Sequence, residues 1–236
     1  MSRPPDSPAP AGGLRCGQVE RAFGGRFGVA IERRYGEILR AARDTFARRG
    51  FHQASAREIA RAADLSLAGL YHYVRGKDEL LFLVLDSALD DLLASLDEAV
   101  AAAATPEAKL VALVRTHLDF GFRQASALKL INRDWELLPE PRRGEIAAKR
   151  GGYLQRGLAI LRDLDTRGRS GDELVSATNL LLGMLNGIAT RPFLKSAENA
   201  RALAGEVSGL FLYGFLERPA DRVPAGAAVH GGAHDA

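Results

Sequence analysis

The sequence predicts an all-α fold, with a small N-terminal helix-turn-helix domain followed by a larger helical body. Apolar residues recur at helical spacing through most of the 236 residues, and no segment alternates as a strand does. Ser-x-x-Glu, Thr-Pro and Gly signals mark where successive helices begin and end. The 47% hydrophobic and 26% charged residues are ordinary for a folded globular protein, which fits this fold class.

The first predicted helix spans residues 32–49. Ile38 and Phe46 fall on one face of it, while Arg and Asp residues fill the other. Gly50 is placed to end this helix, because glycine adopts the left-handed conformation that helix C-termini favour. The preceding residues 1–28 are rich in Pro, Gly and Ala without periodicity, which predicts a disordered N-terminal arm.

Two short helices joined by a turn are predicted next, over residues 55–74. A capping box formed by Ser55 and Glu58 begins the first of them and satisfies two backbone N–H groups. Asp64 lies in the turn and tolerates the left-handed conformation better than most residues. Ser66 is a suitable N-cap for the second helix. This arrangement is a helix-turn-helix.

A long helix is predicted from Lys77 to Ala104, and Thr105-Pro106 then ends one helix and begins the next. Further helices are predicted over residues 106–124, 127–137, 141–165, 171–190 and 197–216. The domain boundaries that follow are 29–84 for the helix-turn-helix domain, 85–217 for the body and 218–236 for a disordered tail.

Charge is unevenly placed along the chain. Residues 1–80 hold 14 Lys and Arg against 9 Asp and Glu, whereas the whole chain has a net charge of only +3. A basic N-terminal third is typical of a nucleic-acid-binding module, and a solvated basic face is the alternative. There is no apolar run long enough for a membrane span, no secretory signal, and one cysteine, Cys16. These features predict a cytoplasmic protein without a membrane association.

The segment from Ala41 to Leu81 resembles the DNA-binding domain of TetR/AcrR-type bacterial transcriptional regulators. The residues that carry the resemblance are Ala42, Phe46, Gly50-Phe51, Ser55, Ile59-Ala60, Ser66, Leu70-Tyr71, Val74 and Lys77-Asp78-Glu79-Leu80-Leu81. The resemblance implies a homodimeric repressor that binds a palindromic operator in double-stranded DNA and is released by a small ligand. It implies no cofactor and no enzymatic activity.

The predicted DNA contacts lie on the two helices of the helix-turn-helix. By the resemblance, Tyr71, Tyr73 and Lys77 hold phosphates and Arg57 reaches a guanine, a common partner of arginine. A solvated surface pair is the alternative for Tyr71 and Lys77. The full predicted set is Ser55, Arg57, Ser66, Leu67, Ala68, Gly69, Tyr71, His72, Tyr73 and Lys77. The arm adds Arg15, Arg21 and Arg26, which either enter the minor groove or form a weakly attracted tail.

The middle helices supply an apolar and aromatic set with sparse polar groups, which predicts a site for an apolar or amphipathic effector. The predicted ligand-binding residues are His117, Phe120, Phe122, Leu128, Ile131, Trp135, Tyr153, Met184 and Asn186. Ordinary core packing is the alternative for each of them.

The segment Leu180–Phe193 resembles an acyl-CoA-responsive branch of the family, which makes an acyl-CoA one candidate effector. Five basic residues either meet the phosphates of CoA or form a solvated helix face: Arg142, Arg143, Lys149, Arg150 and Arg156.

The last two predicted helices carry apolar stripes that predict a dimer interface. The residues are Leu181, Gly183, Ile188, Leu203, Val207, Leu210 and Phe211, and the alternative is that they seal the core of one subunit. A dimer addresses two half-sites about 34 Å apart.

Competing functions find little support in the sequence. There is no recognisable catalytic motif, and no metal site is expected, since His230 and His234 lie in a Gly/Ala-rich tail without helix signals. The remaining alternative is a ligand-binding or protein-interaction helical module without DNA binding.

Overall fold

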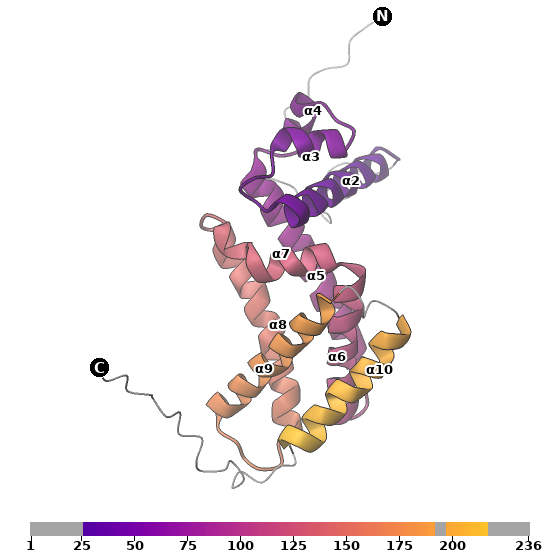
Figure 1. The fold of residues 1–236 in the computed structure, drawn as a ribbon, viewed down its shortest axis with the longest axis vertical. Helices are drawn as coiled ribbons and strands as arrows, with labels where there is room; N and C mark the ends of the chain where they lie inside the picture. Colours follow the sequence, from indigo (N-terminus) through magenta and orange to yellow (C-terminus); the bar gives the residue numbers. More distant parts are fainter. Residues whose placement is uncertain (1–25, 192–196, 217–236) are drawn as a thin grey trace, which may run out of the picture.

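The computed structural model describes residues 26–191 and 197–216, and all of its regular elements in these ranges are helical. Figure 1 shows a small group of helices at one end of the molecule, above a body of longer helices. The all-α fold class is therefore confirmed. The N-terminal arm with Arg15 and Arg21, the Arg26 side chain and the C-terminal tail lie outside the described residues and side chains.

The end group consists of three helices: α2 (Arg26–Arg49), α3 (Ala56–Ala62) and α4 (Leu67–Tyr71). Helix α2 begins six residues before the predicted start at Glu32. It ends as predicted, because Gly50 takes a positive φ of 80° and its N–H donates to the Phe46 carbonyl at 2.8 Å.

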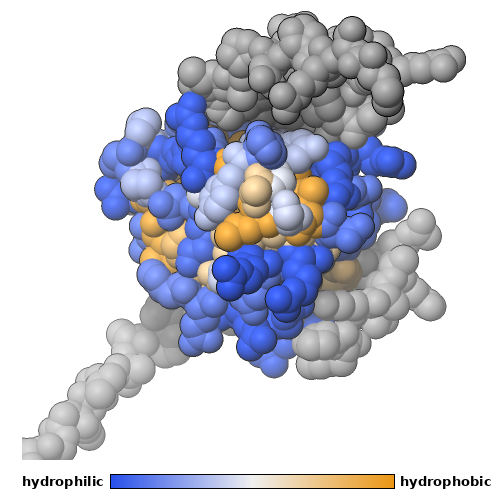
Figure 2. Space-filling model, turned by 90° about the horizontal axis from the view of Figure 1, so that it is seen from above, coloured by the Kyte–Doolittle hydropathy of each residue, from blue (hydrophilic) through white to orange (hydrophobic). Residues whose placement is uncertain are grey.

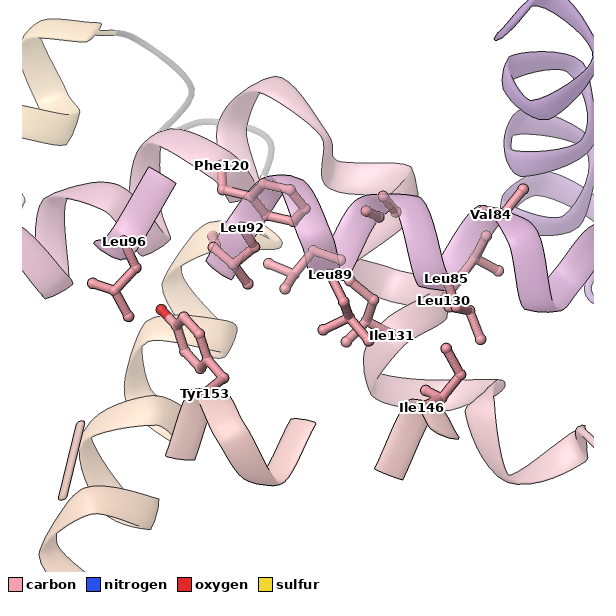
Figure 3. Packing of buried hydrophobic residues seen from close by; sticks show 14 of the residues in the cluster. Val84, Leu85, Leu89, Leu92, Leu96, Phe120, Leu130, Ile131, Ile146 and Tyr153 are labelled. Carbon is pink, nitrogen blue, oxygen red and sulfur yellow. The ribbon is translucent and has the colours of Figure 1, made fainter. Parts of the chain in front are cut away.

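Helix α5 (Lys77–Ala101) connects the two parts of the molecule. Its buried leucines continue the core of the end group into the body without interruption. In Figure 3, Leu89, Leu92 and Leu96 extend along α5, and the ring of Tyr153 lies beside the last two. The two parts therefore share one continuous core rather than two separate ones.

The body is built from the remaining helices (Figure 1). These are α6 (Pro106–Arg123), α7 (Ala125–Arg133), the short 3-10 helix η1 (Trp135–Leu137), α8 (Arg142–Leu164), α9 (Gly171–Ala189), α10 (Ala197–Gly209) and the π-helix η3 (Leu210–Leu216). Helices α6, α7 and α8 pack against α5, while α9 and α10 pack against α6.

Several predicted helices differ in their bounds or type, including the long helix, which ends at Ala101 rather than Ala104. The second helix of the helix-turn-helix stops at Tyr71 rather than Val74, and the helix predicted over 127–137 stops at Arg133. There the buried Asp134 carboxylate accepts from the Arg133 side chain at 2.7 Å, and the chain tightens into η1. The last predicted helix becomes a π-helix from Leu210 onward.

Helices α6 and α9 cross closely at Gly121. A Cβ atom at this position would lie 2.4 Å from the Cβ atom of Ala189, which is shorter than any real contact. Because neither helix backbone can yield without losing packing, glycine is required there.

Candidate functional site

The start of α3 is held by the predicted capping box. The Ser55 hydroxyl accepts from the Glu58 N–H at 3.1 Å, and the Glu58 carboxylate accepts from the Ser55 N–H at 3.0 Å. The Ser55 N–H lowers the pKa of Glu58 below its usual value, and the Ser55 hydroxyl adds to the effect. Both polar groups of the cap are thus satisfied within the chain.

The turn between α3 and α4 is equally complete. Asp64 has a φ of 53°, as predicted for the left-handed position, and its carbonyl accepts from Arg34 of α2 at 2.8 Å. The Ser66 hydroxyl accepts from the Gly69 N–H at 2.9 Å and caps α4. These bonds fix the angle between α3 and α4 and tie both helices to α2.

Most of the predicted DNA contacts lie at the surface of this end of the molecule. Arg57 and Tyr71 are exposed, Tyr71 by 49%. Ser55, Ser66, Ala68 and His72 are also exposed, while Leu67, Gly69 and Tyr73 are half-buried. Figure 2 looks down on this end and shows a small pale and apolar area surrounded by hydrophilic residues. The surface therefore offers a narrow apolar face with a polar rim.

Lys77 has a structural role that the sequence analysis did not predict. Its ammonium group donates to the carbonyl oxygens of Phe51 at 2.8 Å, Ala54 at 3.0 Å and His52 at 3.2 Å. It also lies 4.6 Å from the centroid of the Phe51 ring. An ammonium group has three N–H donors, and all three are used. Lys77 therefore holds the loop before α3 in place, and its phosphate contact stays a prediction.

A cavity of about 460 Å³ lies in the body, between α5, α6, α7, η1, α8 and α9. Six predicted ligand residues line it: His117, Leu128, Ile131, Trp135, Tyr153 and Asn186. Arg150, considered above for CoA phosphates, and Asn132 also line it. The sequence analysis missed the other lining residues Leu89, Leu92, Ala147, Gly151, Leu154, Asn179, Leu182 and Gly183 as ligand contacts. The cavity has the size of an ordinary small-molecule site.

Three predicted ligand residues do not line the cavity. Phe120 is buried in the core, and Phe122 and Met184 pack against that core from its edge. Large apolar side chains occur both in protein cores and in the walls of ligand cavities. Residue type alone therefore could not distinguish core residues from ligand contacts.

A polar group of side chains lies on the cavity wall and extends from buried His117 and Tyr153 to exposed Asn132. The His117 Nδ1 atom is 3.0 Å from the Tyr153 hydroxyl, and Asn132 donates to the Asn186 side-chain oxygen at 2.8 Å. Burial lowers the pKa of His117 to about 4, with Asn186 partly opposing this effect. Burial also raises the pKa of Tyr153 well above its usual value. The group is therefore uncharged at neutral pH.

Arg150 brings a cation to the cavity wall. Its guanidinium carbon lies 4.8 Å from the centroid of the Trp135 ring, and the group donates to the Ile131 carbonyl. Desolvation lowers the pKa of Arg150, and Glu136 opposes that shift. Arg150 thus stacks on an aromatic wall instead of pointing into solvent.

The other basic residues considered for CoA phosphates pair within the chain. Arg142 contacts buried Glu79 at 3.1 Å, Lys149 contacts Asp86 and Asp90, and Arg156 contacts Asp97 at 2.6 Å. These contacts join α8 to α5 in a series that we call the α5–α8 ion ladder. Arg143 contacts Glu140 at 2.9 Å. Neither predicted role, phosphate binding or a simple solvated face, describes the three residues of the ladder.

The predicted interface residues divide into inward and outward groups. Leu181, Val207 and Phe211 are buried in the core, which corrects their assignment to a surface between subunits. Ile188 and Leu203 are half-buried, and Gly183 and Leu210 are exposed. The sequence analysis missed the most exposed apolar side chains nearby, Leu180 and Tyr213, at 67% and 69%.

Among the described residues, no helix is long and apolar enough to cross a membrane. The same part of the chain holds no group of three or more His, Cys, Asp or Glu residues suited to a metal ion. His230 and His234 lie outside the described residues.

Two family models match the chain. "Bacterial regulatory proteins, tetR family" matches residues 38–84, and "Tetracyclin repressor-like, C-terminal domain" matches residues 103–190. The two matches cover the helix-turn-helix with the start of α5, and the body from the end of α5 through α9.

Two curated relatives match over part of their length. The HTH-type transcriptional activator FasR of Mycolicibacterium smegmatis is 33% identical over 119 residues, 50% of this chain and 54% of the relative. The HTH-type transcriptional repressor KstR2 of Rhodococcus jostii is 38% identical over 80 residues, 34% of this chain and 39% of the relative. The chain thus spans about half or less of these relatives in the matched regions.

Solved structures match over most of the fold. A TetR-family transcriptional regulator from Bordetella parapertussis has a TM-score of 0.70 at 26% identity, covering 77% of this chain and 95% of that one. AibR in complex with isovaleryl coenzyme A and operator DNA has a TM-score of 0.67 at 24% identity, covering 75% and 97%.

Proposed function

The chain belongs to the TetR family of bacterial regulatory proteins, and from this premise we propose that it is a DNA-binding, ligand-responsive transcriptional repressor. It acts as a homodimer on a palindromic operator, in the cytoplasm, and a small apolar or amphipathic molecule in the body releases it from DNA. The proposal includes no catalytic step and no cofactor.

The observation that carries the proposal is the contrast within the helix-turn-helix between a closed scaffold and an open face. Three polar side chains form hydrogen bonds within the chain: Ser55, Ser66 and Lys77. By contrast, the side chains of Arg57 and Tyr71 are exposed. A rigid scaffold that presents a few polar groups suits a surface that must fit a DNA groove. Arg57 then reads one base pair, and Tyr71 positions the domain on the backbone.

Exposed apolar side chains of α9 and η3 support the dimer. Leu180, Leu210 and Tyr213 are each more than 60% exposed, and the surface of Gly183 is open. Large exposed apolar side chains are typical of subunit interfaces. A two-fold pair of such surfaces places two copies of α4 on the two half-sites.

The effector occupies the cavity lined by Trp135 and Tyr153. Its apolar walls and few polar groups suit an amphipathic molecule. An acyl-CoA remains a candidate, and AibR, whose solved complex holds isovaleryl coenzyme A, shares only the fold with this chain at 24% identity. Since Arg142, Lys149 and Arg156 are paired inside the chain, the cavity takes the acyl part of such a ligand.

A gel-shift assay with the DNA that flanks the gene tests the proposal. The full chain shifts this DNA at low salt, and Arg57→Ala weakens binding by about tenfold, because a bidentate arginine–guanine contact contributes roughly 1–3 kcal/mol. Arg162→Ala, an equal change of charge in the last turn of α8, leaves binding unchanged. The absence of any shift at low salt would refute the DNA-binding function.

The direction of regulation requires a separate measurement, because one relative is an activator and the other a repressor. Deleting the gene raises transcription from its operator if the protein represses. A fall in transcription would instead make it an activator.

A further inference from the structure

His117 is a polar side chain of the cavity wall that the fold leaves incomplete. It is only 3% exposed, and its Nδ1 atom lies 3.0 Å from the Tyr153 hydroxyl. Its Nε2 atom is buried and has no hydrogen-bond partner of good geometry within the described part of the chain, although the Asn186 side chain lies near enough to oppose the fall in the His117 pKa. A buried polar atom without a partner costs about 1–3 kcal/mol, so its persistence calls for a partner from outside the chain.

The contact with Tyr153 determines which proton the ring carries. Within the described part of the chain, the buried Tyr153 hydroxyl has one hydrogen-bond partner, His117 Nδ1, and a hydroxyl donor needs an acceptor. We therefore assign the Tyr153 O–H as the donor and Nδ1 as the acceptor. A neutral imidazole then carries its hydrogen on Nε2, and the low pKa of about 4 keeps the ring neutral. The unpaired Nε2 atom of His117 is thus a hydrogen-bond donor.

The neighbouring polar groups are already engaged. Asn132 donates to the side-chain oxygen of Asn186 at 2.8 Å. Arg150 is the one cation among the lining residues, and it stacks on Trp135 and donates to a backbone carbonyl. A carboxylate beside His117 would therefore face a neutral donor, and burying an unpaired charge is costly.

We propose that the effector carries a neutral carbonyl group, as in a thioester or ketone, whose oxygen accepts the Nε2–H of His117 at the cavity wall. This inference rests on the proposed effector site and specifies the chemistry of its ligand. An apolar chain on the carbonyl lies against Leu89, Leu92 and Leu128, which line the same cavity.

The chain contains its own reporter for the test, since Trp135 is its single tryptophan and lines the cavity. The full protein is titrated with 2-nonanone and with 2-methyl-1-nonene, in which a methylene group replaces the carbonyl oxygen. Tryptophan fluorescence reports the occupancy. The ketone binds about tenfold more tightly than the alkene, a difference of about 1.4 kcal/mol, because only the ketone accepts a hydrogen bond from the unpaired donor.

Two further probes separate the sources of the carbonyl. Octanoate binds more weakly than 2-nonanone, because the site has no cation free to pair with it. Octanoyl-CoA that competes with the ketone identifies a thioester as an acceptable source. Octanoyl-CoA that does not compete restricts the site to free carbonyl compounds.

Substitutions locate the preference at His117. His117→Phe keeps a ring but removes both nitrogens, so ketone and alkene then bind within about twofold of each other. Tyr153→Phe frees the ring to place its hydrogen on either nitrogen, which reduces the preference without abolishing it. Leu92→Ala serves as the matched control and weakens both probes equally. Circular dichroism checks that each variant is folded.

Equal binding of ketone and alkene to the unmodified protein would overturn the inference, and so would the absence of binding by both. Neither measurement involves DNA. A protein that binds the ketone preferentially but never shifts DNA would therefore lose the proposed regulatory function and keep this site.

Discussion

The helix-turn-helix and the cavity of the body differ in whether their polar groups have hydrogen-bond partners within the chain. Around α3 and α4, Ser55, Ser66 and Lys77 find hydrogen-bond partners inside the chain. In the described part of the body, a buried nitrogen of His117 has no hydrogen-bond partner of good geometry. The first region is therefore complete by itself, whereas we propose that a ligand completes the second.

Glu79 lies where these two regions meet. Its carboxylate accepts from the Arg75 N–H, just before α5, at 2.5 Å and from Arg142 of α8 at 3.1 Å. One buried residue therefore bonds both to the end of the helix-turn-helix and to the body.

The largest expected effect comes from breaking this junction. Glu79→Ala leaves Arg142 and the Arg75 N–H without their acceptor, which lowers the free energy of unfolding by about 3 kcal/mol. Asp91→Ala, which removes an exposed carboxylate from the same helix, changes it by less than about 0.5 kcal/mol. Urea denaturation measures both. Equal effects would show that the bonds of Glu79 add little.

Acid should destabilise the body through His117. Its pKa of about 4 in the folded protein is below the ordinary value of 6.5, so the unfolded chain binds more protons between these pH values. Stability therefore falls as the pH drops from about 6.5 to 4, by up to roughly 3 kcal/mol, and this contribution is constant above pH 6.5.

Thermal unfolding of His117→Phe at several pH values checks this linkage. The variant loses stability less steeply than the unmodified protein over the acid range. His72→Phe, a change at an exposed histidine of the end group, keeps the original slope. An unaltered slope in His117→Phe would assign the acid sensitivity to other groups.

Removing the Lys77 ammonium should loosen the end group. Lys77→Met keeps most of the chain length but deletes three hydrogen bonds to carbonyls, which costs about 2 kcal/mol in this half-exposed position. The salt dependence of DNA binding distinguishes the two roles of the residue. A slope unchanged by the substitution supports the structural role, and a slope reduced by about one unit would support the phosphate contact.

The smallest expected effect is at the turn. Asp64→Val places a β-branched residue at a φ of 53°, which costs about 1 kcal/mol, whereas Asp64→Gly fits this conformation without strain. Thermal unfolding compares the two variants. Similar stability for both would mean that the backbone relaxes away from the left-handed position.

Much of the scaffold could be predicted because its signals are local. The caps at Ser55, Ser66 and Thr105 depend on residues three positions away, and each appears in the structure. A fourth cap, formed by Ser170 and Glu173 at the start of α9, has the same Ser-x-x-Glu pattern as the first. The sequence analysis overlooked it although the signal was present.

The features that were not predicted concern partners that are distant in the chain. The carbonyls that bind Lys77 lie 23 to 26 residues earlier, and no side-chain pattern records them. Leu180 and Leu181 are adjacent, yet one is exposed and the other is buried. Only the packing of α9 in three dimensions decides which faces the core.

The α5–α8 ion ladder has a geometric consequence. Its cations Arg142, Lys149 and Arg156 recur every seven residues, and their acidic partners are spread along α5 from Glu79 to Asp97. Contacts at both ends of the shared length resist translation of one helix along the other, because a slide would separate every pair together. A hinge-like tilt opens one end while the other stays paired. The ladder therefore favours pivoting over sliding as the relative motion of these two helices.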